Sequence, residues 1–218
     1  MNPPFASKFT RLLQTFEDSE LKAFERWLQS PWCNTNKNLP RLLACLKPYH
    51  PEFRNPKLTK EKLFHQVLPN GKYSDRRMNN LLSEGYLAAE KFLALQHFAQ
   101  DQALQRDFMT KEFQDRHLDD WFFKETAREL DRLDEKPVKD WEDHVNLFRL
   151  HRRVYQHPHQ GPRMQAGRRT VIRMNEEIDL RYVLEKASVI NEMIFRNRIF
   201  QGENHDVATE LAKWRAAC

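Results

Sequence analysis

Seven arginines gather in one segment, from His144 to Asn175, that contains no aspartate, glutamate or lysine. They are Arg149, Arg152, Arg153, Arg163, Arg168, Arg169 and Arg173. A guanidinium group is a planar fork that binds phosphate or carboxylate through two parallel hydrogen bonds. Phe148 and Tyr155, in the same segment, offer faces on which nucleic-acid bases can stack. The segment is therefore the first candidate for a surface that binds a partner or an anion.

Three interpretations of this segment stay open. The arginines pair with acidic side chains of the same chain, or bind another protein, or bind nucleic acid. Acidic residues flank the segment on both sides: Asp131, Asp134, Glu135, Glu142, Asp143, Glu176, Glu177 and Asp179. The net charge of the chain is +5, and without the seven arginines it becomes −2, so the basic character of the protein lies in this segment. A mildly basic chain by itself barely favours nucleic acid over other partners.

Arg152 and His157 are separated by four residues. This spacing resembles the Arg-x4-His motif of the HEPN ribonuclease family. The resemblance implies an all-helical fold and metal-independent RNA cleavage, with the two residues at a dimer interface. In that hypothesis Arg152 holds the phosphate while His157 acts on a 2′-hydroxyl group.

Other chemistry is not indicated by the sequence. No glycine-rich loop precedes a helix, so a phosphate cradle is not expected. No cysteine pair has zinc-binding spacing and no His-Glu-x-x-His occurs. His157 and His159 lie in a proline-containing loop without a nearby carboxylate, which makes a poor metal site. We therefore expect no metal, no cofactor and a non-enzymatic role.

The helices that position these residues are predicted from the scarcity of glycine and proline, which interrupt helices. The chain has 5 glycines in 218 residues, and no proline lies between Pro69 and Pro137 or after Pro162. So few turn formers exclude a β-protein and favour long helices joined by a few loops. Helical spacing of apolar residues predicts helices over 5–16, 19–30, 39–48, 59–68, 74–99, 101–115, 118–134 and 138–156, further helices up to Gly202, and a last one over 205–216.

The predicted fold class is all-α, with stacked helical hairpins that resemble tetratricopeptide-type (TPR-like) scaffolds or solenoids. Residues 1–218 are expected to form one helical domain, with a possible subdivision into an N-terminal helical cap, 1–70, and long-helix hairpins, 71–218. Trp121, Phe122 and Phe123 cannot share one helix face, which predicts that their helix is sandwiched between neighbours.

Capping residues mark several predicted helix starts. Asp18 or Ser19, Thr59 and Ser74 each precede an apolar helical pattern and are expected N-caps. Gly85 lies on the apolar stripe of the longest predicted helix, where glycine costs about 1 kcal/mol relative to alanine. Close approach of another helix would explain the glycine.

Three loop and cap signatures resemble the N-terminal part of a family of uncharacterised helical proteins from Bacteroidota. They are Ser30-Pro31-Trp32-Cys33-Asn34-Thr35-Asn36, Leu58-Thr59-Lys60-Glu61-Lys62-Leu63-Phe64, and Ser74-Asp75 followed by Asn80-Leu81-Leu82-Ser83. The resemblance covers about residues 10–200 and carries no known function. It implies that the chain is the N-terminal part of a longer protein.

The N-terminus does not resemble a signal peptide, and no apolar run approaches the roughly 20 residues of a membrane helix. Three scattered cysteines are typical of a reducing compartment. We therefore expect a cytoplasmic scaffold that binds another protein, with nucleic acid as the alternative partner and no membrane. Trp32 and Trp214 are expected as exposed aromatic anchors, since Trp and Arg dominate interface energetics. The sequence does not determine the oligomeric state.

Overall fold

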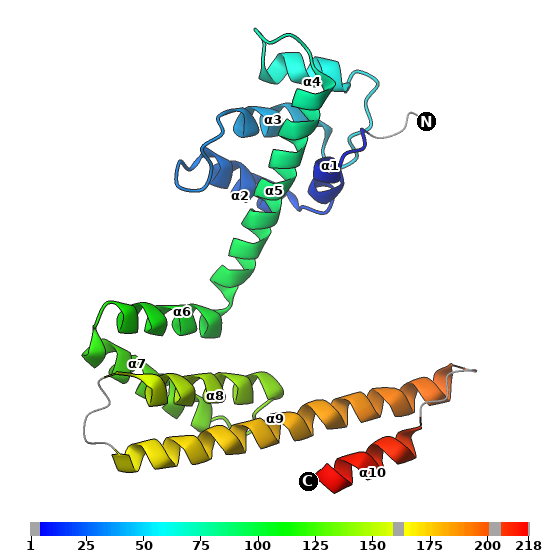
Figure 1. Ribbon diagram of the computed structural model, residues 1–218. Coiled ribbons are helices and arrows are strands. Elements are labelled where there is room, and N and C mark those ends of the chain that lie inside the picture. The colour runs from blue at the N-terminus through cyan, green and yellow to red at the C-terminus, as the bar shows by residue number, and fades with distance from the viewer. Residues whose placement is uncertain (1–4, 159–163, 201–205, 218) are drawn as a thin grey trace. The chain divides into compact units, whose positions relative to one another are not determined.

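The computed structural model describes residues 5–158, 164–200 and 206–217. Within these ranges the regular structure is ten α-helices and one short 3-10 helix, with no strand (Figure 1). The prediction of an all-α fold is confirmed. The chain divides into two compact units, residues 1–101 and 102–218, which are described separately below. This division falls at residue 101, whereas the subdivision considered from the sequence falls at residue 70.

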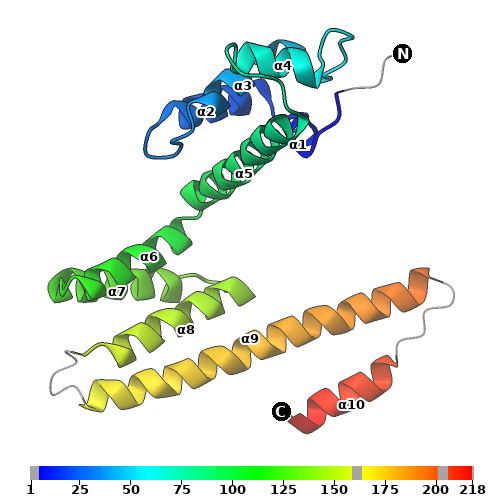
Figure 2. The same cartoon turned by 45° about the horizontal axis from the view of Figure 1, so that its top comes forward.

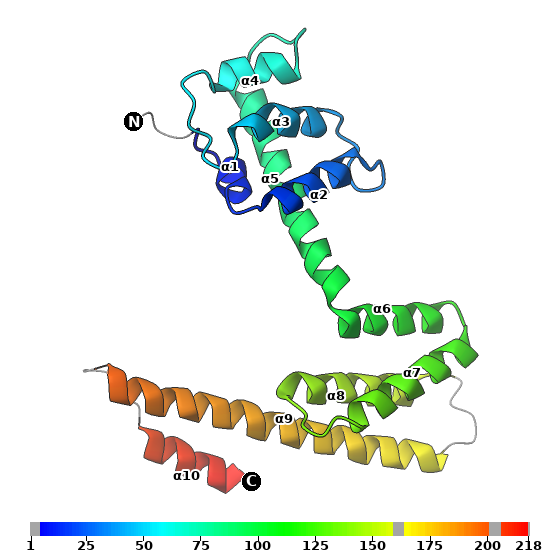
Figure 3. The same ribbon diagram turned by 180° about the vertical axis from the view of Figure 1, so that it is seen from behind.

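The first unit contains α1 (Lys8–Leu13), α2 (Asp18–Gln29), α3 (Asn38–Leu46), the 3-10 helix η1 (Lys47–Tyr49), α4 (Lys60–Val67) and α5 (Asp75–Gln100). The long helix α5 packs against all four shorter α-helices (Figures 1 and 3). Its buried stripe therefore belongs to the same core as α1–α4, and this packing places the long helix in the first unit.

Aromatic rings form the centre of that core. The ring of Phe24 lies 5.2 Å from Phe92 of α5, 5.8 Å from Phe16 and 6.3 Å from Phe9, measured between centroids. All four side chains are almost completely buried. Edge-to-face and tilted ring pairs of this kind add about 0.5–1.5 kcal/mol each beyond the burial of their area.

Helix starts in the first unit agree with the predicted caps at two of three positions. The hydroxyl of Thr59 accepts a hydrogen bond from the Lys62 amide, and that of Ser74 accepts one from the Arg77 amide. The prediction of Asp18 or Ser19 as an N-cap is wrong. The cap position of α2 is Glu17, which makes no side-chain cap. Asp18 lies in the first turn, where its charge favours the helix dipole and one carboxylate oxygen lies 3.8 Å from Nδ1 of His50.

The second unit contains α6 (Gln102–Asp115), α7 (Asp119–Asp134), α8 (Trp141–Gln156), α9 (Met164–Ile199) and α10 (Val207–Ala217). Its main packing joins helices that are consecutive in the chain: α6 with α7, α7 with α8, α8 with α9, and α9 with α10. Figure 2 shows α8 antiparallel to the first half of α9, and α10 along its second half.

The two units differ in how well they bury apolar side chains. The first has a large continuous core, whereas the core cluster of the second consists of Leu133, Leu147 and Leu150 with Leu130 against it. Among the described residues, all the exposed large apolar side chains except Trp32, Leu87 and Leu95 lie in the second unit. Most of the exposed apolar surface of the described chain therefore belongs to the second unit.

The three consecutive aromatic residues at the start of α7 also include a large side chain that stays exposed. Phe122 is completely buried, as a sandwiched helix requires, but Trp121 is 59% exposed. The ring of Trp121 lies edge-on against Phe113 of α6, with 5.6 Å between the ring centroids. The helix α7 packs against both α6 and α8, so the expectation of a helix between neighbours is confirmed, although Trp121 stays exposed.

The structure confirms the close approach predicted at Gly85. A Cβ atom at this position would lie 2.8 Å from Cε1 of Phe9, a side chain held inside the core. We expect Gly85→Ala to destabilise the protein by about 1–3 kcal/mol through overpacking. Urea denaturation followed by circular dichroism measures this change.

The sign of the effect is the critical outcome, because Gly→Ala in an uncrowded helix stabilises by about 1 kcal/mol. Ser83→Ala, at an exposed position of the same helix, is the matched control and should be neutral or slightly stabilising. A stabilised Gly85→Ala protein would contradict the contact with Phe9.

Candidate functional site

The hairpin formed by α8 and α9 gathers the arginine segment. Because the two helices run antiparallel, the last turns of α8 lie beside the first turns of α9 (Figure 2). The arginines of this region therefore come to the closed end of the hairpin, from Arg149, Arg152 and Arg153 on α8 and Arg168, Arg169 and Arg173 on α9. Arg163 lies outside the described residues.

Two of these arginines pair within the protein. Arg153 lies 2.9 Å from a carboxylate oxygen of Asp107 and donates a 2.9 Å hydrogen bond to the Thr110 hydroxyl, which ties α8 to α6. Arg173 lies 3.2 Å from Glu176, one turn along the same helix. For these two residues the interpretation of internal pairing holds.

The other four are Arg149, Arg152, Arg168 and Arg169, which we call the arginine end of the hairpin. All four side chains are exposed. Within the described part of the chain, none of them has a hydrogen bond or an ion pair. The neighbouring acids have other partners, since Asp143 binds Lys136 and Glu177 binds His144. The arginine end is therefore available to an external anion or carboxylate.

A buried polar pair sets the register of this hairpin. Nδ1 of His144 on α8 lies 2.6 Å from a carboxylate oxygen of Glu177 on α9, and both side chains are buried. Two turns further along α8, burial lowers the pKa of His151 below its usual value. Arg173 acts in the same direction, whereas Glu177, Asp134 and Glu176 oppose the shift.

His157 has a structural role at the end of α8. Its ring lies 4.5 Å from Phe122 and 4.8 Å from Phe123, and its Nε2 lies 3.4 Å from Asp119 at the start of α7. The side chain is 1% exposed, whereas Arg152 is exposed. A general base must reach the proton that it abstracts. This burial argues against the ribonuclease hypothesis, because His157 cannot reach a 2′-hydroxyl group.

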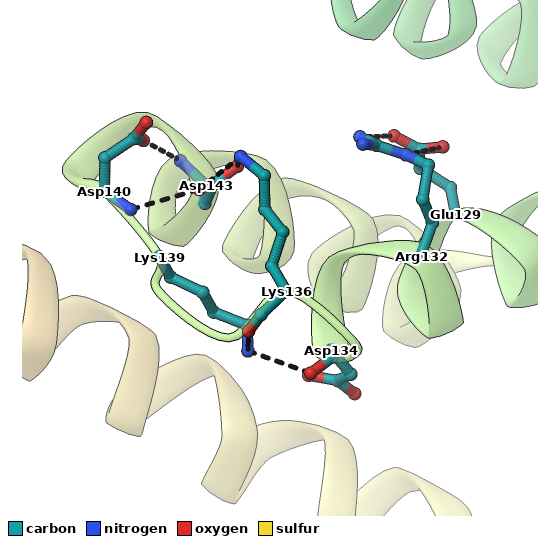
Figure 4. A network of polar contacts seen from close by, with 7 residues as sticks. All are labelled: Glu129, Arg132, Asp134, Lys136, Lys139, Asp140 and Asp143. Atoms are coloured by element: carbon teal, nitrogen blue, oxygen red, sulfur yellow. Dashed lines mark hydrogen bonds and ion pairs between the residues drawn. The ribbon is translucent and has the colours of Figure 1, made fainter.

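The connection between α7 and α8 is held by a polar network (Figure 4). Lys136 donates 2.7 Å hydrogen bonds to both carboxylate oxygens of Asp143, and Asp140 forms a reciprocal capping box with Asp143. Burial raises the pKa of Asp143, but Lys136 and the Asp140 amide outweigh this and hold it below its usual value. The network fixes the start of α8.

A polar hollow of about 260 Å³ lies beside this network. Three cationic side chains line it, Arg106, Arg132 and Lys136. Each is already paired with a carboxylate, the two arginines with Glu129 and Lys136 with Asp143. The hollow is therefore a poor anion site despite its cations.

An apolar groove of about 230 Å³ runs between α8 and α9. Val145 and Phe148 line it from α8, and Ile178 and Tyr182 from α9. Arg181 and Glu185, 3.1 Å apart, lie at its rim. Helical spacing predicted the helices that carry these residues but not the groove, because periodicity shows which residues share a face and not whether another element covers that face.

The two tryptophans proposed as anchors lie in different units. Trp32, in the turn after α2, is 95% exposed. Trp214 of α10 is half-buried. Tyr155, 47% exposed in the last turn of α8, is the aromatic residue that accompanies these arginines.

No helix within 5–158, 164–200 and 206–217 is both long enough and apolar enough to cross a membrane. Among the same residues, no group of three or more His, Cys, Asp or Glu side chains could hold a metal ion. Comparison of the chain with protein-family models, curated proteins and solved structures gives no significant match.

The environment of His151 predicts a pH dependence of stability. Because the folded protein holds this pKa below the unfolded value of about 6.5, protonation favours the unfolded chain. The stability that depends on neutral His151 is fully present above pH 6.5. It is lost as the pH falls through 6.5 towards the pKa of His151 in the folded protein. We expect the free energy of unfolding to fall more between neutral pH and pH 5.5 for the wild type than for His151→Gln, measured by urea denaturation. Equal slopes would contradict this role.

His157→Ala is expected to destabilise the protein by about 1–3 kcal/mol, because it removes a buried ring between Phe122 and Phe123. Thermal denaturation measures this loss, and His97→Ala, at an exposed position, is the control with little change. Labelled RNA should stay intact with both the wild type and His157→Ala. RNA cleavage by the wild type that His157→Ala abolishes would restore the ribonuclease hypothesis.

Proposed function

We propose that this chain is a non-enzymatic helical scaffold that binds another protein through its second unit. The observation that carries the proposal is the arginine end of the α8–α9 hairpin. It consists of four exposed arginines without a partner in the described chain, with exposed Tyr155 beside them. Arg and Tyr are enriched among the side chains that dominate interface energetics. Arginine forks bind carboxylates through two hydrogen bonds, so the partner surface is acidic.

The architecture that we propose for this scaffold is a stack of helical hairpins of the tetratricopeptide type. Support comes from the second unit, where the main contacts join each helix to the next one in the chain. This is the packing of helical repeats, in which each element contacts its neighbours. The resemblance to the helical family from Bacteroidota stays part of the proposal. A cytoplasmic location is likewise proposed, and Cys33 and Cys45 are both free thiols.

RNA binding is the alternative function. The same four arginines could contact phosphates, and Tyr155 could stack on a base. Internal pairing weakens this alternative, because Arg153 and Arg173 are held by acidic side chains of the protein. Nucleic-acid binding through several phosphates would show a steep loss of affinity as salt concentration rises.

The double variant Arg149→Glu with Arg169→Glu tests the proposal. It reverses one exposed charge on each helix of the arginine end, and we expect it to lose the bound partner protein or to weaken its binding at least about tenfold. The measurement is an affinity pull-down from native lysate with nuclease treatment, followed by titration of the purified partner.

Arg26→Glu with Arg76→Glu is the matched control. It changes the net charge by the same amount at two exposed positions of the first unit and should keep the partner. Retention of every partner by the arginine-end variant would contradict the proposal. A partner that nuclease treatment releases, together with salt-sensitive binding of labelled RNA or DNA by the wild type, would replace it with the nucleic-acid alternative.

A further inference from the structure

The helix α9 is much longer than the helices that cover it. Its 36 residues span about 54 Å, whereas the 16 residues of α8 span about 24 Å. The His144–Glu177 pair places α8 on the first half of α9, and a 2.9 Å contact between Lys186 and Glu210 places α10 on the second half. Glu177 and Lys186 are nine positions apart, which is about two and a half turns. The two covering helices therefore lie on opposite faces of α9.

Each face is thus covered along one half and open along the other. Two positions separated by a whole number of turns share a helix face, and about five turns separate Glu177 from Phe195 and Ile172 from Ile190. Glu177 is buried under α8, but Phe195, further along the same face, is 52% exposed. Ile190 is buried on the α10 side, but Ile172, earlier on that face, is 51% exposed. Each half of α9 therefore exposes an apolar side chain on the face that is covered along the other half.

Between these two faces runs an exposed apolar stripe. It consists of Val171, Ile178, Tyr182 and Val189, which are 43%, 50%, 43% and 54% exposed. The residues are 7, 4 and 7 positions apart, so they lie on one side of the helix as in a heptad pattern. This spacing is the same in both chain directions. A stripe with that property is complementary to itself when two copies run antiparallel.

We propose that the occupant of this stripe is a second copy of the same chain, bound antiparallel along α9. The two-fold axis lies level with residue 180, so Val171 meets Val189 of the second copy and Ile178 meets Tyr182 of the second copy. The α10 helix of each copy then lies beside the first half of the other copy's α9, on the face that carries Ile172.

Charge complementarity supports this arrangement. The His144–Glu177 contact makes Arg152, eight positions further along α8, level with residue 169 of the antiparallel α9. The two-fold axis at residue 180 makes residue 169 level with residue 191 of the second copy. Glu192 is adjacent to that position, is exposed, and has no partner among the described residues of its own chain. Arg152 is equally unpaired within the described ranges, so each copy offers the opposite charge to the other, twice per dimer.

The apolar groove described above gains an occupant in the same arrangement. Val145 and Phe148 of α8 lie on the side of the hairpin that also carries Ile178 and Tyr182. The α9 helix of the second copy, lying along the stripe, covers this groove. Of the arginine end, only Arg152 takes part in this contact. Arg149 and Arg169 stay free for the proposed function, so the inference goes beyond that function and does not depend on it.

Sedimentation equilibrium and light scattering of the full chain test the proposal. We expect the wild type to have about twice the monomer mass of 26.3 kDa at micromolar concentration. Ile178→Asp, in the centre of the stripe, should reduce the mass to that of the monomer. Leu180→Asp is the matched control, because this residue is 48% exposed and lies on the opposite side of α9. It should leave the dimer intact.

A charge exchange tests the antiparallel register without any change to apolar residues. Arg152→Glu and Glu192→Arg should each weaken the dimer at least about tenfold, since each places like charges opposite one another. The double variant should restore the dimer, because both contacts are re-formed with their signs exchanged. Circular dichroism confirms that each variant retains its helix content.

Several results would overturn the proposal. A monomeric wild type would do so, as would dissociation by Leu180→Asp with Ile178→Asp unaffected. Failure of the double charge variant to recover the affinity lost in the single variants would exclude the antiparallel register. We expect the double variant Arg149→Glu with Arg169→Glu to keep the dimer mass. This result distinguishes the dimer test from the test of the arginine end.

Discussion

The buried contact between His144 and Glu177 is the constraint on which the proposed binding surface depends. It joins α8 to α9 at a distance of 2.6 Å, away from solvent. Separating the two groups inside the protein would leave polar atoms without hydrogen bonds, which costs more than the bond itself contributes. The pair therefore selects one register among those that apolar packing alone would allow. That register determines which side chains meet at the closed end of the hairpin.

Two consequences follow from this register. The last turns of α8 and the first turns of α9 bring Arg149, Arg152, Arg168 and Arg169 together, although no acidic residue lies among them to neutralise them. The same register leaves Val145 and Phe148 beside Ile178 and Tyr182, as an apolar groove. One polar contact thus produces a basic end and an apolar side on the same hairpin.

The two units use their apolar residues differently. In the first, the close approach of Phe9 to Gly85 and the ring cluster around Phe24 leave few large apolar side chains in contact with water. In the second, the core cluster is small, and α9 exposes apolar residues over most of its length. Exposed apolar surface of this extent on an ordered helix is typical of interaction sites. Among the described residues, nearly all of the exposed large apolar side chains therefore belong to the second unit.

Local patterns in the chain were enough to predict the fold class, most helix boundaries and two caps, because glycine scarcity, apolar periodicity and cap chemistry are local properties. Thr59, Ser74 and Gly85 were predictable for this reason. Which arginines are unpaired depends on how the helices pack against one another. Arg153 and Arg152 are adjacent in the chain, yet one faces Asp107 of α6 and the other faces solvent. Pairing depends on a residue 46 positions away, and burial of His157 depends on the rings of α7. Such contacts are set by the packing of helices, which a linear pattern does not specify.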